Sequence, residues 1–326
     1  MSKLEEIVKI FPLGLRQVLQ ALPLDFEGLQ EIRLRAERPL LLQYQGREIF
    51  GGREGELTDK AGRAYKVSLR DIRETLEMVG RHSLYAFEEE LRQGFLTIQG
   101  GHRIGLAGRT VLEGNKVRSV KYISFLNVRL SHEVRGCGDG VLPFLYGKGG
   151  QVCHTLIISP PRCGKTTLLR DLIRQISDGG QKGEGQPLRP GHTVGVVDER
   201  SEIGGCYLGV PTNDLGIRTD VLDCCPKTEG MMMLIRSMSP EVVAVDEIGS
   251  YEEIHAIEAV LHCGCRLLAT VHGSSMEDML GKPLLKKLVQ EQVFERYVIL
   301  QRPGSEGWVR QILDGQGQIL AGGNLC

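Results

Sequence analysis

The sequence predicts an α/β protein in which a larger domain with a mostly parallel sheet follows a smaller α+β domain. Three observations indicate this class. In the second half, continuous apolar runs typical of fully buried strands alternate with helical patterns. One of these runs leads into a tight loop and then a helix, as at the edge of a parallel sheet. In the first half, shorter apolar runs are interrupted by glycine, which is typical of small antiparallel sheets.

The first domain is expected to span residues 1–135. It should begin with an amphipathic helix over residues 2–22, where charged and apolar residues recur at helical spacing. The alternating segment 29–49 predicts strands that are interrupted at Pro39 and Gly46.

Helices and further strands complete this domain. Ser68, followed three residues later by Asp71, forms a capping pattern and predicts a helix that ends near Val79. A short helix is expected over residues 84–92. The segment 95–130 carries glycine-punctuated β patterns, which predict a small curved antiparallel sheet.

A segment with six glycines, residues 136–150, is expected to be the hinge to the second domain, residues 151–326. In the second domain, alternating strands and helices predict a parallel sheet with helices on both faces. Residues 178–191, rich in glycine and proline, should form a loop. Strands are expected at residues 193–198, 242–246, 266–271 and 297–301, and helices at 165–177, 227–238 and 251–262.

The first strand of the second domain leads into a loop with the form of a phosphate-binding loop. The loop SPPRCGKTT, residues 159–167, follows the template G-x-x-x-x-G-K-[ST], except that Ser159 replaces the first glycine. Its backbone N–H groups would converge on a β-phosphate, aided by the positive end of the following helix. Lys165 would reach the β- and γ-phosphates, and Thr166 would ligate Mg²⁺. The residues expected to bind the nucleotide are Pro161, Arg162, Cys163, Gly164, Lys165, Thr166 and Thr167.

A second motif, EVVAVDEIG at residues 241–249, is an apolar run that ends in two adjacent acids. Because nucleotides bind at the carboxyl ends of parallel strands, Asp246 is expected to hold Mg²⁺ through a bound water or Thr166. Glu247 is expected to orient the water that attacks the γ-phosphate. These two motifs together predict a Mg²⁺-dependent ATPase.

Two further strand ends carry polar residues. Asp198, Glu199 and Glu202 follow the strand in VGVVDERSE, and at least one of them, with Glu199 the candidate, is expected to hold a metal-bound or attacking water. Thr270 and His272 end the strand in LLATVHG, where they would hydrogen-bond the γ-phosphate. The alternatives are a helix cap for the acids and a solvated loop position for the histidine. The catalytic candidates are therefore Glu247, Lys165, Glu199 and His272.

The composition limits the classes of function. A net charge of −1 and 5% aromatic residues give no strong signal for a basic, aromatic-lined nucleic-acid channel. Nine cysteines without a C-x-x-C pair fit a reducing compartment. No apolar stretch approaches the roughly 20 residues of a membrane span, and residues 1–22 do not resemble a signal peptide. A cytoplasmic protein is expected.

The order SPPRCGKTT, VVDERSE, VVAVDEIG and LLATVHG is similar to that of the type II and type IV secretion ATPases. In those families these elements are the phosphate loop, an acidic box, the metal-binding strand and a histidine box. The runs ISPPRCGKTTLLRDLIR and DERSEIGG more closely resemble the stage III sporulation protein AA family of endospore-forming bacteria, along nearly the whole chain. The type II enzymes have an arginine where this chain has Gly249, and their four-cysteine zinc module is missing here.

The resemblance implies a RecA-like P-loop ATPase domain and a homo-oligomer, expected to be a hexameric ring, that closes over ATP and Mg²⁺. It also implies an arginine finger, which can raise the rate about 10³-fold or more. The implied role is the motor of a secretion-like transmembrane channel during endospore formation. The ATPase would lie in the mother-cell cytoplasm, peripherally associated with membrane-embedded channel proteins. The candidate arginine fingers are Arg103, Arg109 and Arg129 in the first domain and Arg218 in the second.

Other functions share parts of this pattern. A type II or type IV secretion or pilus-assembly ATPase, or a nucleic-acid-directed P-loop motor, would have the same central motifs. A GTPase would match D-x-x-G at residues 246–249, but the guanine-reading N-K-x-D is absent. A protein that uses ATP only as a structural clip would not need the intact set Lys165, Thr166, Asp246 and Glu247.

Overall fold

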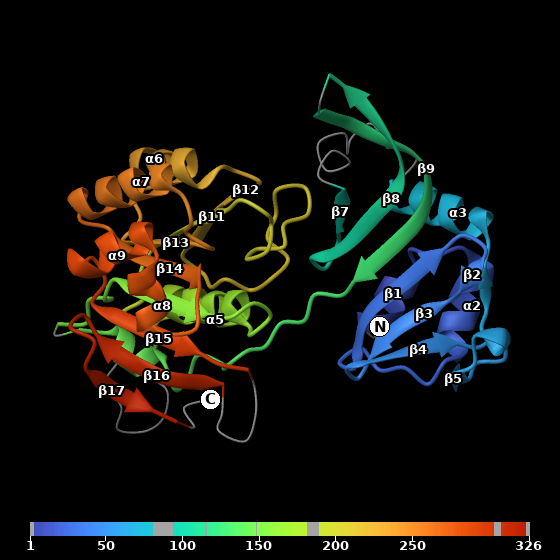
Figure 1. The fold of residues 1–326 in the computed structure, drawn as a ribbon, viewed down its shortest axis with the longest axis horizontal. Coiled ribbons are helices and arrows are strands. Elements are labelled where there is room, and N and C mark those ends of the chain that lie inside the picture. Colours follow the sequence, from blue (N-terminus) through green and yellow to red (C-terminus); the bar gives the residue numbers. More distant parts are fainter. Residues whose placement is uncertain are drawn as a thin grey trace. The chain divides into compact units, whose positions relative to one another are not determined.

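The computed structural model describes residues 3–80, 94–114, 116–147, 149–180, 189–302 and 308–323. The chain forms two compact units, Met1–His132 and Glu133–Cys326 (Figure 1). The helix expected over residues 84–92 lies outside the described residues. The mixed α/β class predicted from the sequence is confirmed.

The first unit contains a seven-stranded sheet with the order β5-β4-β3-β1-β9-β8-β7, and all its pairings are antiparallel. Its apolar core contains Leu29, Ile32 and Leu34 of β1, which are fully buried. The same core includes buried residues of the helices of this unit. A two-stranded sheet pairs β2 with β6. The strands are β1 (Leu29–Arg35), β2 (Arg38–Pro39), β3 (Leu41–Tyr44), β4 (Arg47–Gly51), β5 (Leu57–Thr58), β6 (Lys66–Val67), β7 (Phe95–Ile98), β8 (His102–Glu113) and β9 (Lys116–Arg129).

The helix expected over residues 2–22 is two helices, α1 (Lys3–Val8) and α2 (Leu13–Ala21). The break falls at Pro12, which stands at the N-cap of α2 with an extended backbone. Proline has no N–H to donate and disfavours helical geometry in the preceding residue, so a continuous helix cannot pass this point. Phe11 is fully buried at the break.

The capped helix is confirmed as α3 (Leu69–Val79). The Ser68 hydroxyl accepts from the Asp71 N–H at 3.1 Å, and the Asp71 carboxylate accepts from the Ser68 N–H at 2.8 Å. Two N-terminal donors that a helix leaves unpaired are thereby satisfied.

The second unit contains an eight-stranded sheet with the order β12-β11-β13-β14-β10-β15-β16-β17. Pairings from β12 to β15 are parallel, and β16 and β17 add antiparallel strands at one edge. The strands are β10 (Thr155–Ser159), β11 (Val194–Asp198), β12 (Thr219–Asp223), β13 (Val242–Val245), β14 (Arg266–His272), β15 (Arg296–Leu300), β16 (Val309–Asp314) and β17 (Ile319–Gly322).

Helices cover both faces of this sheet. One apolar core joins α5 to one face, and another joins four helices to the opposite face (Figure 1). The carboxyl ends of β10, β11, β13 and β14 therefore lie along one edge between two layers of helices. The helices are α5 (Lys165–Asp178), α6 (Lys227–Ser237), α7 (Tyr251–His262), α8 (Met276–Gly281) and α9 (Pro283–Gln290).

The segment 136–150, expected to be a hinge, instead packs within the second unit. The Gly138 N–H donates to the buried Asp171 of α5 at 2.8 Å. A short 3₁₀ helix, η3 (Leu142–Leu145), buries both of its leucines in the core beside α5. Glycine content signalled turns here, but the apolar residues between the glycines hold the segment in place.

Five described strands and α-helices of the second unit were not expected from the sequence. They are the edge strand β12, the antiparallel strands β16 and β17, and the short helices α8 and α9. The strand β12 is only half-buried and contains two aspartates, so it lacks the continuous apolar run of the central strands. The helix α8 has six residues, which is too short for a clear helical period.

Candidate functional site

The loop between β10 and α5 has the backbone geometry of a compact turn. Arg162 and Gly164 both have positive φ, 61° and 78°, and α5 begins at Lys165. Gly164 is the N-cap residue and provides no side-chain cap, so the first turn of α5 directs its N–H groups and the positive end of its dipole outward. This is the geometry in which a helix start binds an anion.

A tryptophan from the C-terminal part of the chain packs on this loop. The Trp308 indole N–H donates to the Cys163 carbonyl, and a Cβ at position 164 would lie 2.4 Å from the Trp308 ring. Gly164 is thus required both by its left-handed backbone and by the ring beside it. Trp308 directly precedes β16 and contacts the loop from 145 residues further along the chain.

Four side chains predicted to act together lie together at the end of β13. Lys165 Nζ is 3.2 Å from Asp246 Oδ1 and 3.0 Å from Glu247 Oε2. The Thr166 hydroxyl donates to Asp246 Oδ2 at 3.1 Å. The turn that follows β10 therefore meets the carboxylates that follow β13, although 80 residues separate Thr166 from Asp246.

The electrostatics of this cluster keep its acids ionised. Burial raises the pKa of Asp246, but the Lys165 ammonium and the hydroxyls of Thr270 and Thr166 outweigh it, so the net pKa is lowered. Burial likewise raises the pKa of Glu247, while Lys165 and then His272 lower it, again with a net decrease. Both carboxylates are charged at neutral pH and are available to a cation.

The end of β14 holds the β13 carboxylates in place. The Thr270 hydroxyl donates to Asp246 Oδ1 at 2.5 Å and accepts from the Glu247 N–H at 2.9 Å. The sequence predicted that Thr270 would hydrogen-bond a phosphate, whereas the structure commits its hydroxyl to the acidic pair. His272 Nε2 lies 3.4 Å from Glu247 Oε1, so the histidine pairs with this carboxylate, and its expected contact with the γ-phosphate stays a prediction.

The three acids after β11 have different surroundings. Asp198 is buried and accepts from the N–H groups of residues 202, 203 and 204 at 2.7 to 2.9 Å, so it shapes this loop. Burial raises the pKa of Asp198 to about 6. Glu199 Oε2 pairs with Lys227 Nζ at 2.7 Å. The Glu202 carbonyl accepts from the buried Arg170 of α5 at 2.8 Å, so this contact joins the loop to α5.

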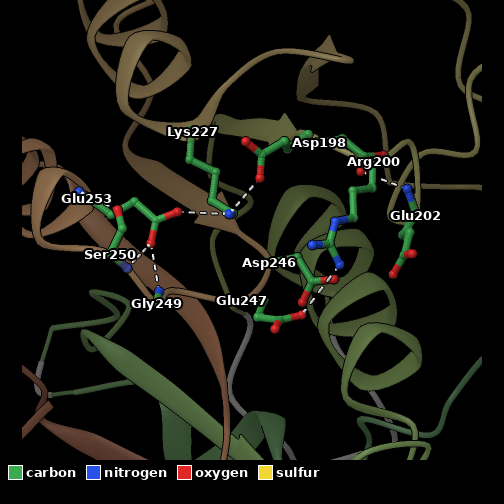
Figure 2. Close-up of a pocket in the computed structure, with 10 residues that line it drawn as sticks. Asp198, Arg200, Glu202, Lys227, Asp246, Glu247, Gly249, Ser250 and Glu253 are labelled. Atoms are coloured by element: carbon green, nitrogen blue, oxygen red, sulfur yellow. Dashed lines mark hydrogen bonds and ion pairs between the residues drawn. The ribbon is translucent and has the colours of Figure 1, made fainter. Parts of the chain in front are cut away.

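A pocket opens at this edge of the sheet, between the ends of β11 and β13 and the starts of α6 and α7 (Figure 2). Six of its lining side chains are acidic and two, Arg200 and Lys227, are basic. Arg200 is exposed and lies 3.9 Å from Glu247 Oε2. The lining residues are Asp198, Glu199, Arg200, Glu202, Lys227, Asp246, Glu247, Gly249, Ser250 and Glu253.

The candidate arginine fingers lie in different places. Arg218 donates to the carbonyls of Ser177 and Asp178, at the C-terminal end of α5. A helix of 14 residues is roughly 20 Å long, so Arg218 lies far from the β10–α5 loop of its own chain, at the other end of α5. Its role as a finger stays a prediction.

The other three arginines belong to the first unit. Arg103 stacks over the Phe95 ring at 4.6 Å, and Arg129 lies 3.6 Å from Glu31. Arg109 is exposed on β8, across from Lys121 on β9. Their roles remain predictions.

Sequence reasoning missed four side chains at this site: Trp308, Arg200, Lys227 and Glu253. Arg200 stands inside the acidic motif DERSE and could have been noted there. Glu253 completes an S-x-x-E capping pattern with Ser250, which could have placed it at a helix start. Trp308 and Lys227 meet the site only through the fold, from positions without a recognisable motif.

Solved structures define the class of fold. The chain superposes on the Legionella pneumophila ATPase DotB with a TM-score of 0.55 and 14% identity, covering 93% of this chain and 80% of that one. It superposes on the pilus retraction motor PilT, solved with bound ADP, with a TM-score of 0.55 and 11% identity, covering 99% and 84%. The chain therefore shares its fold with DotB and PilT.

The sequence then specifies the family. The chain matches the family described as "Sporulation stage III, protein AA" over residues 1–320. It is 40% identical over 319 residues to stage III sporulation protein AA of Bacillus subtilis (strain 168), covering 98% of this chain and 97% of that protein. The chain therefore belongs to the stage III sporulation protein AA family, as its motifs predicted.

A plant protein shares part of the chain. SEEDLING PLASTID DEVELOPMENT 1 of Arabidopsis thaliana is 30% identical over 166 residues, which is 50% of this chain and 22% of that protein.

Throughout the described residues, every helix is too short or too polar to cross a bilayer.

Proposed function

We propose that this protein is a Mg²⁺-dependent ATPase with a RecA-like P-loop domain. One observation carries the proposal: Lys165 and Thr166, at the start of α5, lie within 3.2 Å of the two carboxylates that follow β13. A helix start and a basic side chain that face adjacent acids at the carboxyl edge of a parallel sheet are the parts that phosphoryl transfer needs. The fold shared with DotB, named an ATPase, supports this function.

The loop and α5 would bind the triphosphate. The N–H groups from residue 162 to residue 167 would donate to the phosphate oxygens, and Lys165 would move from the carboxylates towards the β- and γ-phosphates. Trp308 keeps the loop in its turn conformation through the Cys163 carbonyl. The binding surface is thus largely preformed, which limits the ordering cost of binding.

The residues present suit Mg²⁺. The Thr166 hydroxyl and the Asp246 carboxylate are hard oxygen donors 3.1 Å apart, and Asp246 stays ionised. Mg²⁺ prefers such ligands and takes its remaining ones from water and phosphate. Thr166 and Asp246 would hold the ion, which supplies charge neutralisation on the phosphate oxygens.

Glu247 would position the water that attacks the γ-phosphorus. As the new P–O bond forms and the bond to the β-phosphate oxygen breaks, Glu247 can accept the proton that the water loses. His272 lies on the other carboxylate oxygen and would hold the side chain in orientation. Glu199, in the loop after β11, would hold a metal-bound or attacking water. Its side chain is held there by the ion pair with Lys227.

The cellular role proposed here follows the family. The ATPase would drive a secretion-like channel between mother cell and forespore, from the mother-cell cytoplasm, docked on membrane-embedded channel proteins. It would work as a homo-oligomer, as a hexameric ring, with Arg103, Arg109 or Arg129 completing the site of a neighbour. The name of PilT, a pilus retraction motor, supports a mechanical use of this fold.

Two measurements test this function. Phosphate release from ATP by the purified full chain should require Mg²⁺ and should be lost in Lys165→Ala. The gene should restore heat-resistant spores to Bacillus subtilis that lacks its 40% identical relative, and the Lys165→Ala gene should not. An inactive purified protein together with full spore rescue by Lys165→Ala would refute the ATPase function.

A further inference from the structure

The turn that carries Glu247 is held from two sides. Glu247 has a φ of 40°, in the left-handed region that costs a non-glycine residue roughly 1 kcal/mol or more. On one side, Thr270 binds the Glu247 N–H. On the other side, Glu253 of α7 accepts from the N–H groups of Gly249 and Ser250 at 2.6 and 2.9 Å. The strained conformation persists because its neighbours fix the turn.

The carboxylate of Glu253 also binds a lysine from another helix. Lys227, the first residue of α6, places Nζ 2.8 Å from Glu253 Oε1 (Figure 2). The same Nζ lies 2.7 Å from Glu199 Oε2. The side chains of Lys227 and Glu253 are each only 11% exposed. Burial lowers the pKa of Lys227, but its two carboxylate partners outweigh it and the net pKa is raised. Glu253 is likewise kept charged by Lys227 and the two backbone donors.

We propose that Lys227 is a positioning residue, which acts through Glu253 to hold the 247–250 turn and thereby aims the Glu247 carboxylate at the reacting water. This proposal rests on the proposed ATPase function. Lys227 contacts Glu253, and Glu253 contacts the Gly249 and Ser250 amides. The short backbone from Gly249 to Glu247 connects these amides to the catalytic candidate.

A purely structural ion pair would behave differently. The capping box of α7, Ser250 with Glu253, needs only the backbone donors and the Ser250 hydroxyl. Lys227 adds a buried counter-charge that keeps the carboxylate in one orientation, with Oε2 on the two amides and Oε1 on the ammonium. Lys227→Met retains the helix and its apolar stem but removes this charge. A displacement of about 1 Å in a catalytic group costs on the order of 100-fold in rate.

The kinetic experiment compares Lys227→Met, Lys227→Arg and wild type in the full-length protein. We expect Lys227→Met to lower kcat by roughly 10- to 100-fold, with KM and the Kd for a fluorescent ATP analogue nearly unchanged. Lys227→Arg should recover most of the rate, because a guanidinium can bind both carboxylates. Lys287→Met is the matched control, because it removes a lysine of α9 that pairs with Glu258 of α7 at 3.0 Å. Its kcat should equal that of wild type.

A double-variant cycle tests the route. If Lys227 acts through Glu253, Lys227→Met combined with Glu253→Gln should lose no more rate than the worse single variant. Additive losses would overturn the proposal, and so would a raised Kd with unchanged kcat, because Lys227 would then contact the nucleotide itself.

A readout without ATP separates this proposal from the ATPase function. Hydrogen exchange should become faster at the Gly249 and Ser250 amides in Lys227→Met and stay unchanged in Lys287→Met. If wild type releases no phosphate but this exchange changes as expected, the ATPase function fails, while the proposal that Lys227 holds the 247–250 turn through Glu253 stands. Unchanged exchange at both amides would overturn that proposal itself.

Discussion

Replacing Glu247 by glutamine should separate hydrolysis from binding. Glutamine keeps the shape of the side chain and the backbone N–H that donates to Thr270, so the turn after β13 is preserved. What is lost is the charge that lies 3.0 Å from Lys165 Nζ and 3.4 Å from His272 Nε2. The variant therefore changes the chemistry of the site more than its structure.

The structure sets the expected size of this effect. Losing a positioned acid–base group costs about 10²- to 10⁴-fold in rate. The Glu247 side chain is 36% exposed, so solvent water can take part of its role and the lower end of this range applies. We expect kcat to fall about 100-fold, equivalent to about 2.7 kcal/mol in the barrier. Removing one negative charge beside a triphosphate should leave the Kd equal or lower.

The assay is steady-state phosphate release with Mg-ATP, together with the Kd of a fluorescent ATP analogue. Glu291→Gln is the matched control, because Glu291 is an exposed glutamate at the end of α9 that pairs with Lys287. A Glu247→Gln variant whose kcat stays within about threefold of wild type would remove this residue from the mechanism.

Three further predictions concern binding and stability. Lys165→Ala should weaken Mg-ATP binding by at least about 100-fold, because each lost hydrogen bond to a charged group is worth about 1.5–3 kcal/mol; a calorimetric Kd within about tenfold of wild type would contradict this. Ser68→Ala should lower the free energy of unfolding in denaturant by about 1 kcal/mol and leave ATP turnover unchanged, and equal stability would show that the cap of α3 is dispensable. Acid should destabilise the first unit through His102, whose Nδ1 accepts from the Ser131 N–H and whose pKa burial lowers from 6.5 to about 4. Between these values the unfolded chain binds more protons, so about 3 kcal/mol of stability present at pH 7 is lost as the pH falls to 4; His102→Gln should flatten this slope, and an unchanged slope would exclude His102 as its source.

The central strands and the motif-bearing loop could be predicted because local sequence specifies them. The strands β11, β13 and β14 are continuous apolar runs, and each ends in the polar residues that were singled out. Because parallel strands place their carboxyl ends on one edge, the meeting of Lys165 and Thr166 with Asp246 followed from the pattern alone. The capped start of α3 was equally local.

What could not be predicted depends on contacts between distant segments. Trp308 reaches the phosphate loop across 145 residues, and Lys227 reaches Glu253 from another helix. Arg218 stood in a plausible motif, yet its side chain caps the far end of α5. The six glycines of segment 136–150 predicted a linker, but burial of Leu142 and Leu145 fixes this segment in the core.

The central claim is that the edge formed by the ends of β10 and β13 binds Mg-ATP. Isothermal titration calorimetry of the wild-type full chain with a non-hydrolysable ATP analogue tests it most directly. We predict saturable heat with one nucleotide bound per chain, and weaker binding when Mg²⁺ is chelated. Folded protein that gives no heat and no change in Tm at saturating nucleotide would contradict the claim.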